Sequence, residues 1–145
     1  AIIGLIGDPS QSPLADEILA ALPSGRALNL CLGEPLEELV ATISLARILI
    51  GPCSGPKHIA MVLGVPTFTL YGPTGPEQWG AFFDQPLHAH IRSTRHRLTP
   101  RELMGLPPSF VMDALEPAEV WSALAAHLCG LDTPCNNDPP EYSCC

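Results

Sequence analysis

Basic charge is scarce in this sequence of 145 residues. Lysine and arginine together number 7 against 15 aspartates and glutamates, which gives a formal net charge of −8, and Lys57 is the only lysine. Proteins bind nucleic acids largely through lysine and arginine contacts with phosphates. No basic stripe offsets the acidic composition, so nucleic acid is excluded as an expected partner.

Long apolar runs are missing as well. No apolar stretch reaches the roughly 18–20 residues that a membrane-spanning helix needs, and no secretory signal peptide is recognisable. We therefore expect at most peripheral membrane association. The chain starts directly in a strand-like run, Ile2-Ile3-Gly4-Leu5-Ile6-Gly7, so we expect it to be a piece of a longer protein.

The six cysteines lack the spacing of a metal site, and a chain with a full apolar core does not need disulfides. Cys31 and Cys53 lie in the regular part of the sequence, whereas Cys129, Cys135, Cys144 and Cys145 come late and without paired C-x-x-C motifs. A zinc site among the late cysteines is an alternative, but we favour no metal. The proline-rich segment 132–145 is predicted to be a flexible tail.

Strand-like and helix-like stretches alternate in the first half of the chain, and the pattern predicts an α/β fold with a Rossmann-like open parallel sheet and flanking helices. One domain is expected over residues 1–131, which is incomplete at its N-terminus. After Gly80 no regular pattern is predicted until a final helix over 118–128, which Gly130 should end. The expected strands are 2–6 (buried), 27–32, 47–50 and 65–71, and the expected helices are 14–22, 35–45 and 58–63.

The segment Ala46 to Thr74 is predicted to organise the rest. It reads as strand, small-residue turn, helix, strand and second turn, and a right-handed crossover would bring both turns to the carboxyl edge of the sheet. Ser54 and Gly55 stand where the helix should begin, and Pro56 suits its first turn. A helix N-terminus offers free backbone N–H groups and partial positive charge, so the first turn is interpreted as a phosphate-binding site.

Several motifs in and around this segment resemble the ADP-heptose:lipopolysaccharide heptosyltransferase family. Weaker likeness lies at Asn29-Leu30-Cys31-Leu32-Gly33 and at Met112-x-x-Leu115-x-Pro117. The central motifs are Ser54-Gly55-Pro56-x-His58-x-Ala60, Leu63-Gly64-Val65-Pro66-Thr67 and Leu70-Tyr71-Gly72-Pro73-Thr74-x-Pro76-x-x-Trp79-Gly80.

The resemblance implies the C-terminal, donor-binding half of a GT-B glycosyltransferase. Its substrates would be a nucleotide-diphosphate sugar, ADP-heptose or a related donor, and a lipopolysaccharide core acceptor, with no separate cofactor. The catalytic base would belong to an N-terminal acceptor-binding domain that this chain lacks, so the chain alone should be inactive and no catalytic residue is assigned. A cytoplasmic location is implied, and a position at the inner face of the bacterial inner membrane stays open.

Seven residues are candidate donor contacts. Ser54 and Gly55 would bind the diphosphate through backbone amides, and His58 would donate to a phosphate or sugar oxygen or else be an ordinary packed histidine. Thr74 is either a second hydroxyl contact or a helix cap, while Leu32 and Gly33 would line the nucleobase slot. Cys53 stands where the family usually has an acid. Lys57 is expected in solvent, and Trp79 is expected to pack.

Two alternatives stay open. Pro52-Cys53 in place of the acid would suit a non-catalytic binding or regulatory module on a GT-B scaffold, and another GT-B nucleotide-sugar enzyme would share the same turn. The arginine-rich stretch 92–101 is either a lip for an anionic acceptor or a solvated loop that balances the acidic surface.

Overall fold

The structure, a computed structural model, describes residues 2–83, 85–99 and 101–132. These residues fall into two compact units, a first unit, Ala1–Thr42, and a second unit, Ile43–Cys145, and each is described by itself. The prediction of one domain over residues 1–131 therefore stays a prediction. The predicted flexible tail lies outside the described residues, apart from Asp132.

The first unit is built on two parallel strands. β1 (Ile3–Leu5) pairs with β2 (Ala27–Asn29) in the register Ile3↔Ala27, and between them run η1 (Pro9–Gln11) and α1 (Ser12–Ala21). The side chain of Asn29 joins strand to helix, because its Nδ2 donates to Ser12 Oγ at 2.8 Å and to Asp16 Oδ1 at 2.7 Å. Helix α2 (Leu36–Ser44) starts in this unit and ends in the second.

The expectation of a buried first strand is wrong. The strand forms, but Ile2 is 69% exposed and Ile3 47% exposed, and Leu28 on β2 is 53% exposed. A pair of strands offers only a narrow surface for helices to cover, and the buried side chains of this unit, Ala15 and Cys31, are small. An apolar run predicts a strand but does not settle how many of its faces are covered.

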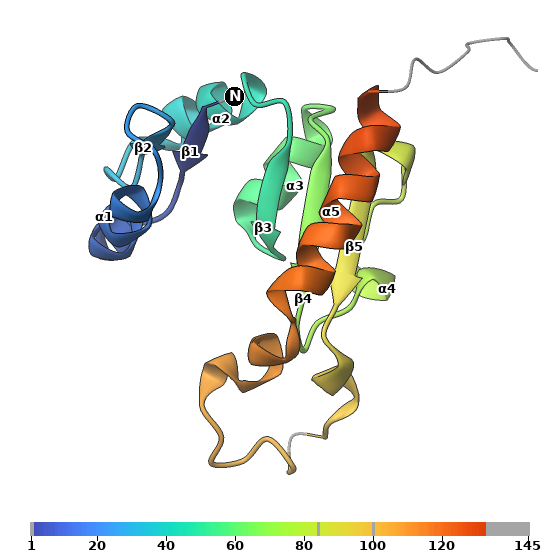
Figure 1. Ribbon diagram of the computed structural model, residues 1–145. Helices are drawn as coiled ribbons and strands as arrows, with labels where there is room; N and C mark the ends of the chain where they lie inside the picture. Colours follow the sequence, from blue (N-terminus) through green and yellow to red (C-terminus); the bar gives the residue numbers. More distant parts are fainter. Residues whose placement is uncertain (1, 84, 100, 133–145) are drawn as a thin grey trace, which may run out of the picture. The chain divides into compact units, whose positions relative to one another are not determined.

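The second unit holds a three-stranded parallel sheet in the order β3-β4-β5. β3 (Leu49–Pro52) leads through α3 (Gly55–Val62) to β4 (Thr67–Tyr71), and α4 (Pro76–Trp79) and η2 (Gln85–Leu87) lead on to β5 (His88–Arg92). Two further 3-10 segments, η3 (Thr94–Arg97) and η4 (Pro108–Ala114), precede α5 (Pro117–Asp132). Figure 1 shows α5 lying along β4 and β5.

Side chains of β4 alternate between two environments. Phe68 is buried and its ring lies 6.3 Å from that of His127 on α5. Thr67, Thr69 and Tyr71 are also buried and face α3, since with Lys57 and Met61 of that helix they line one small cavity. The sheet is thus covered by α5 on one face and by α3 on the other (Figure 1), as expected for a parallel sheet.

Two elements differ from the sequence prediction. β5 was missed, because the alternation His88-Ala89-His90-Ile91-Arg92 carries histidines rather than apolar residues on the side that shares the cavity with α3. The final helix continues through Gly130 to Asp132, so Gly130 does not end it. No helix among the described residues is long and apolar enough to cross a membrane.

Candidate functional site

The turn from β3 to α3 has the geometry expected of an anion seat. Ser54 is the N-cap residue with extended backbone (φ −148°, ψ 174°), and Gly55 and Pro56 open the helix. Both Ser54 and Gly55 are exposed, and a Cβ built on Gly55 would meet nothing within 4 Å. The Ser54 side chain makes no capping hydrogen bond. Among the described residues the N-cap side chain thus leaves the first amides of α3 uncapped, as an anion-binding helix start requires.

The second predicted turn lies at the same edge of the sheet. β3 and β4 are parallel in the register Pro52↔Leu70, so Cys53 and Gly72 both follow their strands at the carboxyl end. Thr74 is exposed within this second turn. The predicted parallel pairing, with both turns at the carboxyl edge of the sheet, is thus confirmed, and Thr74 shares this edge with Ser54.

Lys57 is not in solvent, contrary to the prediction. It is 1% exposed, and its Nζ donates to the backbone oxygen of Trp79 and lies 3.5 Å from Tyr71 Oη. Burial lowers the pKa of Lys57 below its usual value. The burial of Lys57 could have been predicted from the helical spacing, because Lys57 is three residues before Ala60 and four before Met61 and shares the helix face of these buried residues.

Tyr71 belongs to the same cluster. Its Oη donates to the Trp79 oxygen at 2.9 Å, so one carbonyl accepts from both Lys57 and Tyr71. Burial, with a smaller contribution from neighbouring Cys53, raises the pKa of Tyr71 to about 12. These bonds tie α4 to α3 and to β4, and sequence reasoning assigned Tyr71 no role.

Cys53 lies beside the cluster formed by Lys57, Tyr71 and the Trp79 carbonyl, and it is also partly exposed to solvent. The residue is half-buried, and its Sγ lies 4.0 Å from Lys57 Nζ. At the position for which the resemblance implied an acid, this chain therefore places a thiol next to its only lysine.

His58 lies in the first turn of α3 and is half-buried. Its ring meets that of Trp79 edge to face, with centroids 5.9 Å apart. Burial and the charge of Lys57 lower the pKa of His58, so the imidazole is neutral at neutral pH and acts as a hydrogen-bonding group rather than a cation. Trp79 is only partly packed, at 48% exposed. With His58, Gln78, Phe82 and Phe83 it lines a groove of about 300 Å³.

Leu32 and Gly33 belong to the first unit. Leu32 is 68% exposed, and Gly33 has φ +77°, a conformation that favours glycine. A Cβ on Gly33 would lie 3.0 Å from Pro9 Cγ. Both residues follow β2 at its carboxyl end, and their role in a nucleobase slot stays a prediction.

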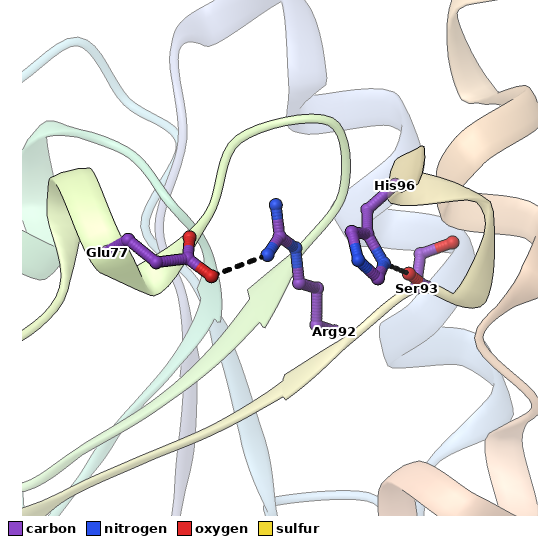
Figure 2. Close-up of polar contacts among 4 residues, drawn as sticks. All are labelled: Glu77, Arg92, Ser93 and His96. Atoms are coloured by element: carbon purple, nitrogen blue, oxygen red, sulfur yellow. Dashed lines mark hydrogen bonds and ion pairs between the residues drawn. The ribbon is translucent and has the colours of Figure 1, made fainter. Parts of the chain in front are cut away.

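The arginine-rich stretch is partly tied down by protein contacts. Arg92 ends β5 and its Nη1 donates to Glu77 Oε1 at 2.8 Å, as Figure 2 shows. Arg95 donates to the Phe110 oxygen at 2.7 Å and lies over the ring of Phe110. His96 Nδ1 lies 2.6 Å from the Ser93 oxygen. Arg92 belongs to the stretch predicted to be either a lip for an anionic acceptor or a solvated loop, but neither Arg92 nor Glu77 was predicted as a donor contact. No cluster of three metal-ligating residues occurs within the part of the chain that the structure describes.

The parallel strands and flanking helices are those of glycosyltransferase structures. The chain superposes on a glycosyl transferase family 9 structure from Veillonella parvula with a TM-score of 0.72 at 18% identity, covering 88% of this chain and 36% of that one. It superposes on ADP-heptose LPS heptosyltransferase II of E. coli with a TM-score of 0.61 at 23% identity, over 91% of this chain and 38% of that one. These likenesses establish the fold.

The family follows from the sequence match. The model of glycosyltransferase family 9 (heptosyltransferase) matches residues 3–101. The chain therefore belongs to glycosyltransferase family 9, which confirms the resemblance drawn from the motifs.

Two curated relatives agree with this assignment. Lipooligosaccharide heptosyltransferase 2 of Haemophilus influenzae is 33% identical over 78 residues, which are 52% of this chain and 22% of that protein. Lipopolysaccharide heptosyltransferase 2 of Salmonella typhimurium is 33% identical over 94 residues, 63% of this chain and 26% of that protein. The matches thus span about a quarter of each relative.

Proposed function

We propose that this chain binds the nucleotide-diphosphate sugar of a heptosyltransferase reaction, ADP-heptose or a close analogue, and supplies the donor-binding half of the enzyme. The acceptor would be a lipopolysaccharide core, the acceptor-binding half a separate N-terminal domain, and the location cytoplasmic. The observation that carries the proposal is the open turn at the start of α3, where exposed Ser54 and Gly55 leave helix amides free.

The chemistry of the leaving group favours this seat. A glycosyl transfer releases a nucleoside diphosphate, and groups that hold its negative charge lower the barrier. Backbone amides at a helix start provide such a field without a metal ion. His58 in the first turn and Thr74 on the neighbouring turn would add neutral hydrogen-bonding groups. Cys53 at the end of β3 would lie next to the bound sugar or phosphate.

The test places a charge in the proposed seat. Gly55→Asp has open space for its side chain, and an acid in the first turn of a helix favours folding. In isothermal titration calorimetry with ADP, we expect Gly55→Asp to bind at least tenfold more weakly than the native chain, a loss of about 1.4 kcal/mol. Gly55→Asn, of the same size without the charge, should lose much less.

Thermal unfolding of each variant is the folding control, since Gly55→Asp should melt no lower than the native chain. The proposal fails if the native chain gives no saturable heat with millimolar ADP, or if Gly55→Asp binds ADP as tightly as Gly55→Asn does.

A second candidate is a non-catalytic binding module on the same scaffold. The observation that favours it is the Cys53 thiol beside Lys57 at the position of the family's acid. A Cys53→Asp variant discriminates the two candidates. If the chain is a module that has lost the sugar contact, restoring the acid should increase its affinity for ADP-heptose relative to ADP. If the chain is already adapted to its donor, Cys53→Asp should give no such increase.

A further inference from the structure

A diphosphate carries more negative charge than helix amides alone neutralise, so a positively charged side chain near the seat is expected to neutralise the remainder. The ammonium of Lys57 is buried and already donates to Trp79 and Tyr71. The imidazole of His58 is neutral at neutral pH because burial lowers its pKa. Arg95 is engaged by the backbone and ring of Phe110. This leaves Arg92 to be considered among the described residues of this edge.

Arg92 lies at the same edge of the sheet as the proposed seat. It is the last residue of β5 and pairs in register with Tyr71, the last residue of β4. Cys53 follows Pro52, which pairs with Leu70, so these strand ends are level with one another. Neighbouring strands lie about 4.8 Å apart, and β3 and β5 are therefore separated by about 10 Å across β4.

The guanidinium of Arg92 leans over the turn that carries Thr74. A Cβ built on Gly75 would lie 2.6 Å from Arg92 Nη2 and 2.9 Å from its Cζ. Glycine at position 75 thus leaves the space that the guanidinium occupies, directly beside Thr74. Arg92 at the end of β5 and Gly75 in the turn after β4 therefore together place a positive charge beside Thr74 at the carboxyl edge of the sheet.

The hydrogen bonds of Arg92 leave donors to spare. A guanidinium has five N–H groups, and within the described residues one of them, on Nη1, meets Glu77 Oε1 at 2.8 Å. The Nε atom is buried and has no hydrogen-bond partner among the described residues. The Arg92 side chain is 24% exposed while that of Glu77 is 68% exposed, so the carboxylate is the partner that can leave.

The weakness of the Arg92–Glu77 ion pair favours its replacement by a pair between Arg92 and a phosphate. An ion pair with one exposed partner contributes little to stability, whereas a guanidinium and a phosphate form two parallel charge-assisted bonds. A phosphate can replace the Glu77 carboxylate on Arg92 with a net gain.

We propose that Arg92 is a donor-binding residue that contacts the terminal phosphate of the nucleoside diphosphate, and that Glu77 holds the guanidinium in place until this phosphate displaces it. The inference rests on the proposed function and deepens it. It assigns the leaving-group charge to a side chain on β5, outside the motifs by which the family was recognised. Glu77 acts as a positioning and competing residue.

The experiment titrates ADP and AMP into the full chain and its variants by calorimetry. Arg92→Gln should weaken ADP binding at least tenfold and AMP binding by less than threefold, because AMP lacks the terminal phosphate. Glu77→Gln should tighten ADP binding several-fold, because the competing carboxylate is gone. Arg92→Lys, which keeps the charge but not the two-pronged geometry, should fall in between. Arg97→Gln removes the same charge from an exposed residue of η3 and should bind ADP as the native chain does.

Two failures are distinguishable. If the native chain binds ADP and Arg92→Gln binds it equally well, the role of Arg92 is overturned and the proposed function stands. The same holds if Arg92→Gln weakens ADP binding and AMP binding equally. Absence of ADP binding by the native chain overturns both. Circular dichroism confirms folding, and if Arg92→Gln is misfolded, the decision falls to Arg92→Lys and Glu77→Gln, for which unchanged ADP affinity overturns the inference.

Discussion

The carbonyl of Trp79 accepts hydrogen bonds from two buried side chains, Lys57 on α3 and Tyr71 on β4. Burying an ammonium is costly unless its N–H groups are satisfied, and here a backbone oxygen and a phenol do this. The arrangement fixes the position of α4 relative to the first turn of α3. Lys57, in the middle of the proposed phosphate-binding motif, thus holds the turn in place from its buried side and leaves contact with the proposed anion to other groups.

Tyr71 carries a prediction on pH. Its folded pKa of about 12 is above the ordinary 10.0, so its contribution to stability is complete below pH 10 and is lost as pH rises from 10 to about 12. The chain has two tyrosines. We expect ultraviolet absorbance at alkaline pH to show a tyrosine transition with a midpoint near 12, which should be absent in Tyr71→Phe.

Tyr71→Phe should also lower the free energy of unfolding at pH 7 by about 1 kcal/mol, the usual contribution of one hydrogen bond, because Lys57 still donates to Trp79. Urea unfolding measures this loss, and circular dichroism shows over which pH range the chain is folded. A single tyrosine transition near pH 10 in a chain that is still folded would contradict the assignment.

At the scale of elements, the end of β5 is joined to the segments that follow it by one hydroxyl. Ser93 is fully buried, its Oγ donates to the Val111 oxygen in η4, and it accepts from the Arg95 amide at 3.2 Å. This serine therefore links β5, η3 and η4, and with them the position of Arg92.

Ser93→Ala should destabilise the chain by about 1–3 kcal/mol, because it removes the buried hydrogen bond from Ser93 Oγ to the Val111 oxygen. Ser109→Ala is the matched control, since Ser109 is exposed and its Oγ bonds to Asp113 at 3.1 Å, and such surface changes stay within about 0.5 kcal/mol. Urea midpoints of the two variants give the comparison, and equal midpoints would show that Ser93 does not hold these elements together.

Elements with strong periodicity could be predicted from the sequence, and those defined by tertiary contacts could not. The turn at Ser54-Gly55-Pro56 was located because cap, glycine and proline act within a few residues. β5 was missed because His88 and His90 look polar in sequence, yet they face α3 across the small cavity. The contact between Arg92 and Glu77 was also missed, because these residues are fifteen positions apart and nothing local in the sequence predicts that their side chains meet.

The whole chain combines a net charge of −8 with a proposed anionic ligand. Long-range repulsion of ADP by this charge is screened by salt within about 10 Å at 0.1 M, so binding has to come from groups close to the phosphates. The proposed groups are the α3 amides and the Arg92 guanidinium, both at the carboxyl edge of one three-stranded sheet.

Binding and turnover should therefore separate in this chain. Transfer of a sugar to a hydroxyl needs a base within hydrogen-bonding reach of the acceptor as well as a seat for the leaving diphosphate. Among the described residues of the proposed seat, Lys57 is buried and His58 is only partly exposed, and the matched relatives are about four times longer than their shared segments. We expect saturable ADP binding together with no ADP release above background when the chain is incubated with ADP-heptose and a lipopolysaccharide core acceptor. Release of ADP that depends on the acceptor, and that Gly55→Asp abolishes, would mean that this chain carries a base of its own.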